Sequence, residues 1–268
     1  DFDRSLDAST ARVLAFGASV GVLYTFQRAM IETVKSTVEV QKSLADINVI
    51  MNTTSRGLQS FGMDLFKVAK DTGQSFKVVA EAATELSRQG LGMQETLKRV
   101  RDALILTRLS GLDTVSSVEA LTAAINSFSD SALTSTEIIN KLANVDAAFA
   151  VSSRDLAEAI RRVGSSAQDV GVDIDKLVAL VTSAQQTTAR GGAVIGNALK
   201  TIFTRVQRTD VLDQLEMVGV RVRDMSQNVL PATEILQSLA LSYDKLGQSQ
   251  RSQISELVGG VYQINILK

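Results

Sequence analysis

Helix breakers are rare along this sequence. Pro231 is the single proline among 268 residues, whereas proline makes up about 5% of an average globular protein. Alanine and leucine are frequent, and both favour the helical backbone. Strand-like alternation of apolar and polar residues is scarce. These features predict an all-α fold.

Glycines and helix-start signals divide the chain beyond residue 57 into segments of helical length. The expected helices cover 57–71, 75–89, 93–109, 115–128, 135–150, 153–168, 173–189, 209–217 and 249–258. Capping boxes are expected at Ser116–Glu119 and Thr134–Glu137, with a related pair at Ser152–Asp155. Pro231 suits a helix start, the helix that follows should run to Gly247, and extended pairing is expected near 220–222.

Helical hairpins recur along the chain at about 38–40 residues, the kind of period that stacked repeats show. A short echo links VAEA at 79–82 with LAEA at 156–159, each within a helix that a glycine break follows. The echo is too short to establish a repeat. The sequence therefore predicts either a multi-helix bundle or a solenoid-like array of helical hairpins.

The first 55 residues differ from the rest of the chain. No charged residue occurs from Val13 to Gln27, and the segment 11–26 carries a Gly17/Gly21 pair that allows close helix approach. Such a segment of about 22 Å is short for a membrane core of about 30 Å. We expect Val13, Gly17, Gly21 and Phe26 to contact neighbouring helices, with membrane contact as the alternative.

A long amphipathic helix should follow, from about residue 20 to residue 51, because charges of alternating sign are spaced by three or four residues. The expected domains are therefore 1–55, the apolar segment with this helix, and 56–268, a helical domain. The chain begins at Asp1 and its last residues lie inside an apolar run. We therefore expect it to be part of a longer polypeptide.

Composition restricts the chemistry that this chain can perform. Cysteine and histidine are absent, which removes thiolate nucleophiles, imidazole bases and ordinary zinc sites. The net charge of −1 disfavours dedicated nucleic-acid binding. Asp173 and Asp175 suit a helix start better than a cation site. The residues predict no catalytic site, no cofactor and no metal.

The stretch 184–206 joins a helix end, a double glycine and a new helix. A phosphate loop would need Lys and Ser/Thr directly after its last glycine, but Asn197 follows Gly196. We interpret the stretch as a packing junction, in which small residues let one helix approach another closely. The candidate packing residues are Gly191, Gly192, Gly196, Ala198, Leu199 and Lys200. Four cations at 190, 200, 205 and 208 give this region local positive charge, which suits a solvated helix face better than contact with an acidic partner or a phosphate backbone.

Several short motifs in a consistent order resemble the conserved helical region of phage tail tape measure proteins, also called phage minor tail proteins. The motifs are GLGMQETL at 90–97, VDAAFAVS at 145–152, AEA at 157–159, GV at 171–172 and RGGAVIGNALK at 190–200. The ending VGGVYQI at 258–264 is similar too, although Val258 stands where that family more usually has an aromatic residue. The resemblance covers roughly residues 30–268.

The resemblance implies a long, mostly helical protein inside the tail tube of a virion, assembled in the host cytoplasm. Such a protein sets tail length, scaffolds tube assembly and takes part in DNA ejection. Its expected partners are tail tube proteins, tail tip or baseplate hub proteins, tail assembly chaperones and further copies of itself, as a trimer or hexamer. Contact with the host membrane during ejection is a further expectation. The alternatives are a membrane-active, pore-forming helical protein and a helical adaptor scaffold.

Overall fold

The computed structural model describes residues 38–267 of the chain, and in this range the fold is all-α, as predicted. The first described helix covers 38–51. The helices that follow are α3 Ser55–Thr72, α4 Phe76–Arg88, α5 Met93–Ser110, α6 Thr114–Ser127, α7 Ser135–Ala148, α8 Ser153–Asp169, α9 Ile174–Thr188, α10 Gly192–Val206, α11 Thr209–Met217, α12 Ala232–Tyr243 and α13 Gln248–Leu267, with a short 3-10 turn at Ser129–Ser131.

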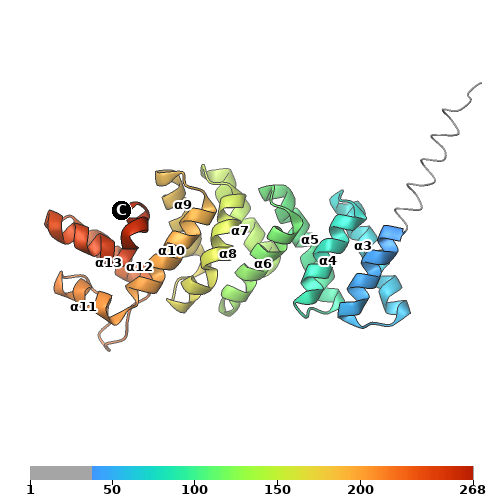
Figure 1. Ribbon diagram of the computed structural model, residues 1–268, viewed down its shortest axis with the longest axis horizontal. Coiled ribbons are helices and arrows are strands. Elements are labelled where there is room, and N and C mark those ends of the chain that lie inside the picture. Colours follow the sequence, from blue (N-terminus) through green and yellow to red (C-terminus); the bar gives the residue numbers. More distant parts are fainter. Residues whose placement is uncertain (1–37, 268) are drawn as a thin grey trace, which may run out of the picture.

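The helices form an elongated array of hairpins rather than a closed bundle (Figure 1). Between α3 and α10, consecutive helices alternate between two rows. Helices α4, α6, α8 and α10 pack side by side in one row, which we call the even row. In the other, the odd row, α3 packs against α5 and α5 against α7, and α9 packs on α8 and α10. Of the two predicted architectures, the solenoid-like array is the one observed.

The even row repeats in sequence as well as in structure. Its helices begin at Phe76, Thr114, Ser153 and Gly192, so each start lies 38 or 39 residues after the previous one. The seventh residue after every N-cap is a buried alanine, namely Ala82, Ala120, Ala159 and Ala198. The echo noticed in the sequence therefore extends to four helices. A side chain without atoms beyond Cβ lets neighbouring helices of the row lie close together.

Local signals explain most helix ends. Thr134 and Glu137 form the predicted capping box of α7. The capping box predicted at Ser116–Glu119 is wrong, because α6 starts earlier, at the N-cap Asp113, whose side chain accepts from the N–H of Ser116. Aspartate is as good an N-cap as serine. Glu119 instead pairs with Arg161 of α8.

The region after α11 differs in detail from the sequence prediction. Val222 accepts a hydrogen bond from the N–H of Leu230, and an isolated bridge joins Arg223 to Val229, slightly beyond the expected segment 220–222. Helix α12 ends at Tyr243 rather than at Gly247. Helix α13 continues past its expected end, with one non-helical residue, Gly260.

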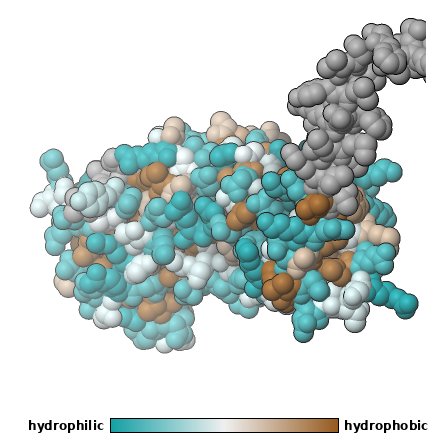
Figure 2. Space-filling model, turned by 45° about the vertical axis from the view of Figure 1, so that its right-hand side comes forward, coloured by the Kyte–Doolittle hydropathy of each residue, from teal (hydrophilic) through white to brown (hydrophobic). Residues whose placement is uncertain are grey.

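The core runs along the array between the two rows and consists mainly of aliphatic side chains. Phe61 and Phe203 are the largest side chains that it buries completely. On the face shown in Figure 2, exposed apolar residues form separate patches among polar ones, several of them at the N-terminal end of the array. At that end Phe66 and Phe76 stack with ring centroids 4.1 Å apart.

The predicted N-terminal features are described only in part. Residues 38–51 are helical, and Ile47 of this helix is fully buried in the core. Val13, Gly17, Gly21 and Phe26 lie outside the described residues. Among the residues that the structure describes, no helix has the length and apolar character needed to cross a membrane. The domain division at residues 55 and 56 stays a prediction.

Candidate functional site

The double glycine lies where α10 begins against α8. Gly191 has φ 81°, a left-handed conformation that glycine adopts without strain. Its N–H donates to Oε1 of Gln185 at the end of α9, over 2.8 Å. The N–H of Gly192 donates to Oδ1 of Asp155 in α8, also over 2.8 Å. The turn between α9 and α10 is thus tied to both neighbouring helices.

Gly192 and Gly196 face the backbone of α8. A Cβ at Gly192 would overlap the backbone of Asp155, and a Cβ at Gly196 would lie 2.9 Å from Cα and O of Ala159. Because these glycines are four residues apart, they lie on one side of α10. Only a helix without side chains at both positions can pack so close to α8.

The other candidate packing residues divide between core and surface. Ala198 and Leu199 are buried in the core with Ile202 and Phe203, while Lys200 is exposed. The structure therefore places Gly191, Gly192 and Gly196 at the α8–α10 contact, buries Ala198 and Leu199, and leaves Lys200 at the surface.

Asp155 completes this contact, a role that the sequence did not reveal. Ser152 caps α8 by accepting from the N–H of Asp155, and its hydroxyl donates to Oδ2 of Asp155 over 2.6 Å. The other carboxylate oxygen is free to accept from Gly192. The predicted pair Ser152–Asp155 thus differs from an ordinary capping box, because its carboxylate lies at the positive N-terminal end of α10. The position that a phosphate would take in a phosphate loop is filled by this side chain.

The four cations around this stretch are not gathered into one free patch. NH1 of Arg205 donates to backbone oxygens of α13, and Arg208 pairs with Asp210 over 3.2 Å. Arg190 and Lys200 are exposed. Two of the four cations, Arg205 and Arg208, therefore already bind other groups of the protein.

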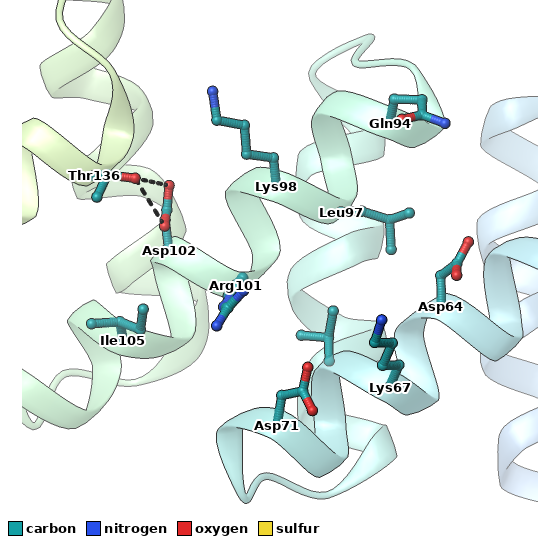
Figure 3. Close-up of a pocket in the computed structure, with 11 residues that line it drawn as sticks. Asp64, Lys67, Asp71, Gln94, Leu97, Lys98, Arg101, Asp102, Ile105 and Thr136 are labelled. Carbon is teal, nitrogen blue, oxygen red and sulfur yellow. Dashed lines mark hydrogen bonds between the residues drawn. The ribbon is translucent and has the colours of Figure 1, made fainter.

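The odd row has grooves on its surface. One hollow of ≈ 770 Å³ lies between α3 and α5 and reaches the start of α7 (Figure 3). Charged side chains of both signs line it, among them Lys67 and Asp71 from α3 and Lys98 and Arg101 from α5. The buried carboxylate of Asp102, also from α5, accepts from the hydroxyls of Ser135 and Thr136 at the start of α7.

A second groove of ≈ 470 Å³ lies between α7 and α9 and is mainly apolar. Val145 and Phe149 line it from α7, and Val178 and Ala179 line it from α9. Phe149 is 51% exposed, so this aromatic ring is open to solvent. Lys141 pairs with Asp175 across the groove over 2.6 Å.

Acidic side chains at helix starts act as caps. Asp173 accepts from the N–H of Lys176 at the start of α9, over 2.8 Å. Partial burial opposes ionisation of Asp173, but its hydrogen bonds from Lys176 outweigh this and lower its pKa. Within residues 38–267 no group of three or more His, Cys, Asp and Glu is placed to hold a metal ion.

The geometry defines an all-α, two-row helical array in which α8 and α10 pack closely. The family model for phage-related minor tail proteins matches residues 64–259. The chain therefore belongs to the phage-related minor tail protein family, and the resemblance to tape measure proteins is confirmed.

Among individual proteins, the chain is similar to the tape measure protein of Pneumococcus phage Dp-1. The two are 21% identical over 217 residues, which cover 80% of this chain and 19% of the phage Dp-1 protein. The chain thus corresponds to about a fifth of that relative's length. No solved structure matches it.

Proposed function

We propose that this chain is the helical array of a tail tape measure protein, a structural component of the virion located in the tail tube lumen or at the tail tip. The observation that carries the proposal is the family match, which spans nearly the whole described array from α3 to α13. The similarity to a tape measure protein supports the same role.

In this role the full-length protein sets tail length, scaffolds assembly of the tail tube and takes part in DNA ejection. Its partners would be tail tube proteins, tip or baseplate hub proteins and tail assembly chaperones, with a trimer or hexamer of the protein itself. The array suits such work, because an elongated array offers two long surfaces per copy. Membrane contact through residues 11–26 stays a prediction.

We further propose that Gly191, Gly192, Gly196, Ala198 and Leu199 serve as a packing motif of this domain, with Lys200 at its surface. The close approach of α10 to the backbone of α8 supports this assignment. The motif would keep the even row closed while the protein is assembled with its partners.

The test uses the phage that encodes the chain. A stop codon at Gln94 in the full-length gene should leave heads without normal tails in electron micrographs, and the wild-type gene supplied in trans should restore them. Peptides of the chain should be found by mass spectrometry in purified tails, at a constant ratio to tube protein. Normal tails from the stop mutant, or tails that lack these peptides, would refute the structural role.

Tail length is measured separately. An in-frame deletion of one hairpin repeat, residues 114–152, should give tails shorter than wild type. If tails form with unchanged length, the array is a structural part of the tail but does not contribute to the length measurement. A control deletion of the same size in an unrelated tail-fibre gene should leave tube length unaltered.

A further inference from the structure

Helix α13 contains one sharp bend. It is helical on both sides of Gly260, whose φ of 68° and ψ of 170° are far from helical values. Residues with side chains rarely adopt this φ, so glycine is needed for the bend. A single residue therefore separates the observed shape from a continuous helix of 20 residues, Gln248–Leu267.

Arg205 from the last turn of α10 lies inside the bend. Its NH1 donates to the backbone oxygens of Glu256, over 3.4 Å, and Leu257, over 3.3 Å. In a continuous α-helix these two oxygens would accept from the N–H groups of residues 260 and 261, four positions later. The guanidinium thus caps the end of the first half of α13, beside the bend.

Arg205 also occupies the space that a side chain at position 260 would need. A Cβ added to Gly260 would lie 3.2 Å from Cζ of Arg205. The bent backbone and the guanidinium therefore lie in close contact. If the arginine moved away, both backbone oxygens would lose the hydrogen bonds that it donates to them.

Beyond the bend, residues 261–267 turn back toward α12 (Figure 1). Leu267 lies in a hollow of ≈ 250 Å³ with Leu236, Leu239 and Tyr243 of α12. Ile266 and Leu267 also pack against the edge of the core. We call residues 261–267 the strap, because they cover part of the apolar side of α12.

We propose that the strap has two positions, and that Arg205 and Gly260 form the switch between them. In the bent position Arg205 holds the end of the first half of α13 and the strap covers α12. In the straight position α13 is one helix of about 30 Å, Arg205 is released and the hollow beside α12 is open. The Arg205 hydrogen bonds favour the bent position, and a continuous run of backbone hydrogen bonds favours the straight one. The inference does not depend on the proposed role in the phage tail.

The test measures the distance between the strap and α12 with two spin labels. The chain has no cysteine, so labels attach only where cysteine is introduced. Tyr262→Cys reports on the strap and Gln237→Cys on α12, and both positions are exposed. The control pair joins Ser252→Cys, in the first half of α13, to the same position on α12.

In the wild-type background the 262–237 pair should give mainly one short distance by pulsed electron spin resonance. Gly260→Ala should shift the main peak to a longer distance, because alanine disfavours the bend. Arg205→Met keeps the aliphatic stem but removes the donors, and should add a second, longer peak. The 252–237 distance should stay unchanged in both variants.

Two further variants control for strain and for charge. Gly73→Ala introduces a side chain at a similar φ of 65° in open space at the far end of the array, and Arg208→Met removes an exposed arginine. Neither variant should change the 262–237 distance.

The proposal is overturned if the 262–237 distance is unchanged in Arg205→Met while circular dichroism shows that the fold is retained. It is equally overturned if both pairs shift together, since the whole of α13 would then have detached. If Gly260→Ala does not fold, the 262–237 distance in Arg205→Met alone decides whether the proposal holds.

Discussion

The two rows of the array are built from the same kind of helix but pack differently. In the even row, Gly192 and Gly196 bring the backbone of α10 against that of α8 at Asp155 and Ala159. In the odd row, grooves lie between α3 and α5 and between α7 and α9. The absence of a side chain at two positions thus lets one pair of helices meet backbone to backbone.

The largest expected effect concerns glycine at helix starts in the two rows. Gly192→Ala should destabilise the protein by about 3 kcal/mol, because the new Cβ would overlap the backbone of Asp155. The melting temperature, followed by circular dichroism, should fall by roughly 6–12 °C. Gly92→Ala is the matched control at the start of α5 in the odd row, where nothing lies within 4 Å of the added atom. It should cost less than about 1 kcal/mol. Equal losses of stability in Gly192→Ala and Gly92→Ala would mean that the two rows do not differ in packing at these positions.

A second prediction concerns a position of the even row at which three helices have an apolar residue and the fourth has serine. The fourth residue after the N-cap is Val79, Leu156 or Ile195 in three helices, but Ser117 in α6. The Ser117 hydroxyl is buried, and within the described part of the chain it has no hydrogen-bond partner. Ser117→Ala should therefore stabilise the protein by about 1 kcal/mol, measured by urea denaturation.

The control for Ser117 is another buried serine of the even row. The Ser87 hydroxyl donates to the backbone oxygen of Ala83 over 2.6 Å, so Ser87→Ala should give no gain in stability. A loss of stability in Ser117→Ala would contradict the prediction and would indicate that the Ser117 hydroxyl has a partner, such as a buried water molecule.

The smallest expected effect is a pH dependence that both rows share. Hydrogen bonds from Ser116 lower the pKa of Asp113, which caps α6 in the even row. Hydrogen bonds from Thr134 lower the pKa of Glu137 at the start of α7 in the odd row. A carboxylate with a lowered pKa in the folded state stabilises that state above its unfolded pKa of about 4, and this contribution is lost as the pH falls through the folded pKa.

Stability to urea should therefore be constant near neutral pH and fall below about pH 4. Asp113→Asn keeps a good N-cap but cannot titrate, so its stability should depend less steeply on pH in the acid range. Protection factors of the amides at the starts of α6 and α7, which correct for the slower intrinsic exchange in acid, should fall together on acidification. A fall in one row alone would show that acidic caps matter to one side of the array only.

Much of the fold follows from local sequence signals. Helix boundaries from α3 to α11 lie within a few residues of those predicted, because glycine breaks, caps and apolar spacing all act within one or two helical turns. The Ser116–Glu119 prediction was wrong because Asp113 provides an earlier cap of equal quality. Helical spacing shows which residues share a face, while only the neighbouring helices decide whether that face is covered; Phe149 at the end of α7 is 51% exposed.

Only part of the candidate site could be predicted from the sequence. Glycine spacing indicated a close helix contact, but the partner helix and the part played by Asp155 depend on residues 37 positions apart. The same holds for Arg205 and the bend at Gly260, since the arginine meets backbone oxygens 51 and 52 residues later. Such contacts have no local signature, because any arginine in a last helical turn could point to solvent.

The sequence by itself therefore determined that the chain is helical, where most helices begin and end, and which tail-protein family it resembles. These properties depend on backbone propensities, caps and short motifs. Tertiary structure alone decided that the helices form two rows, that α10 lies against the backbone of α8, that the odd row has grooves, and that α13 is bent over α12. The reason is physical: packing depends on which surfaces meet, and in this protein the meeting surfaces come from segments 37 to 52 residues apart.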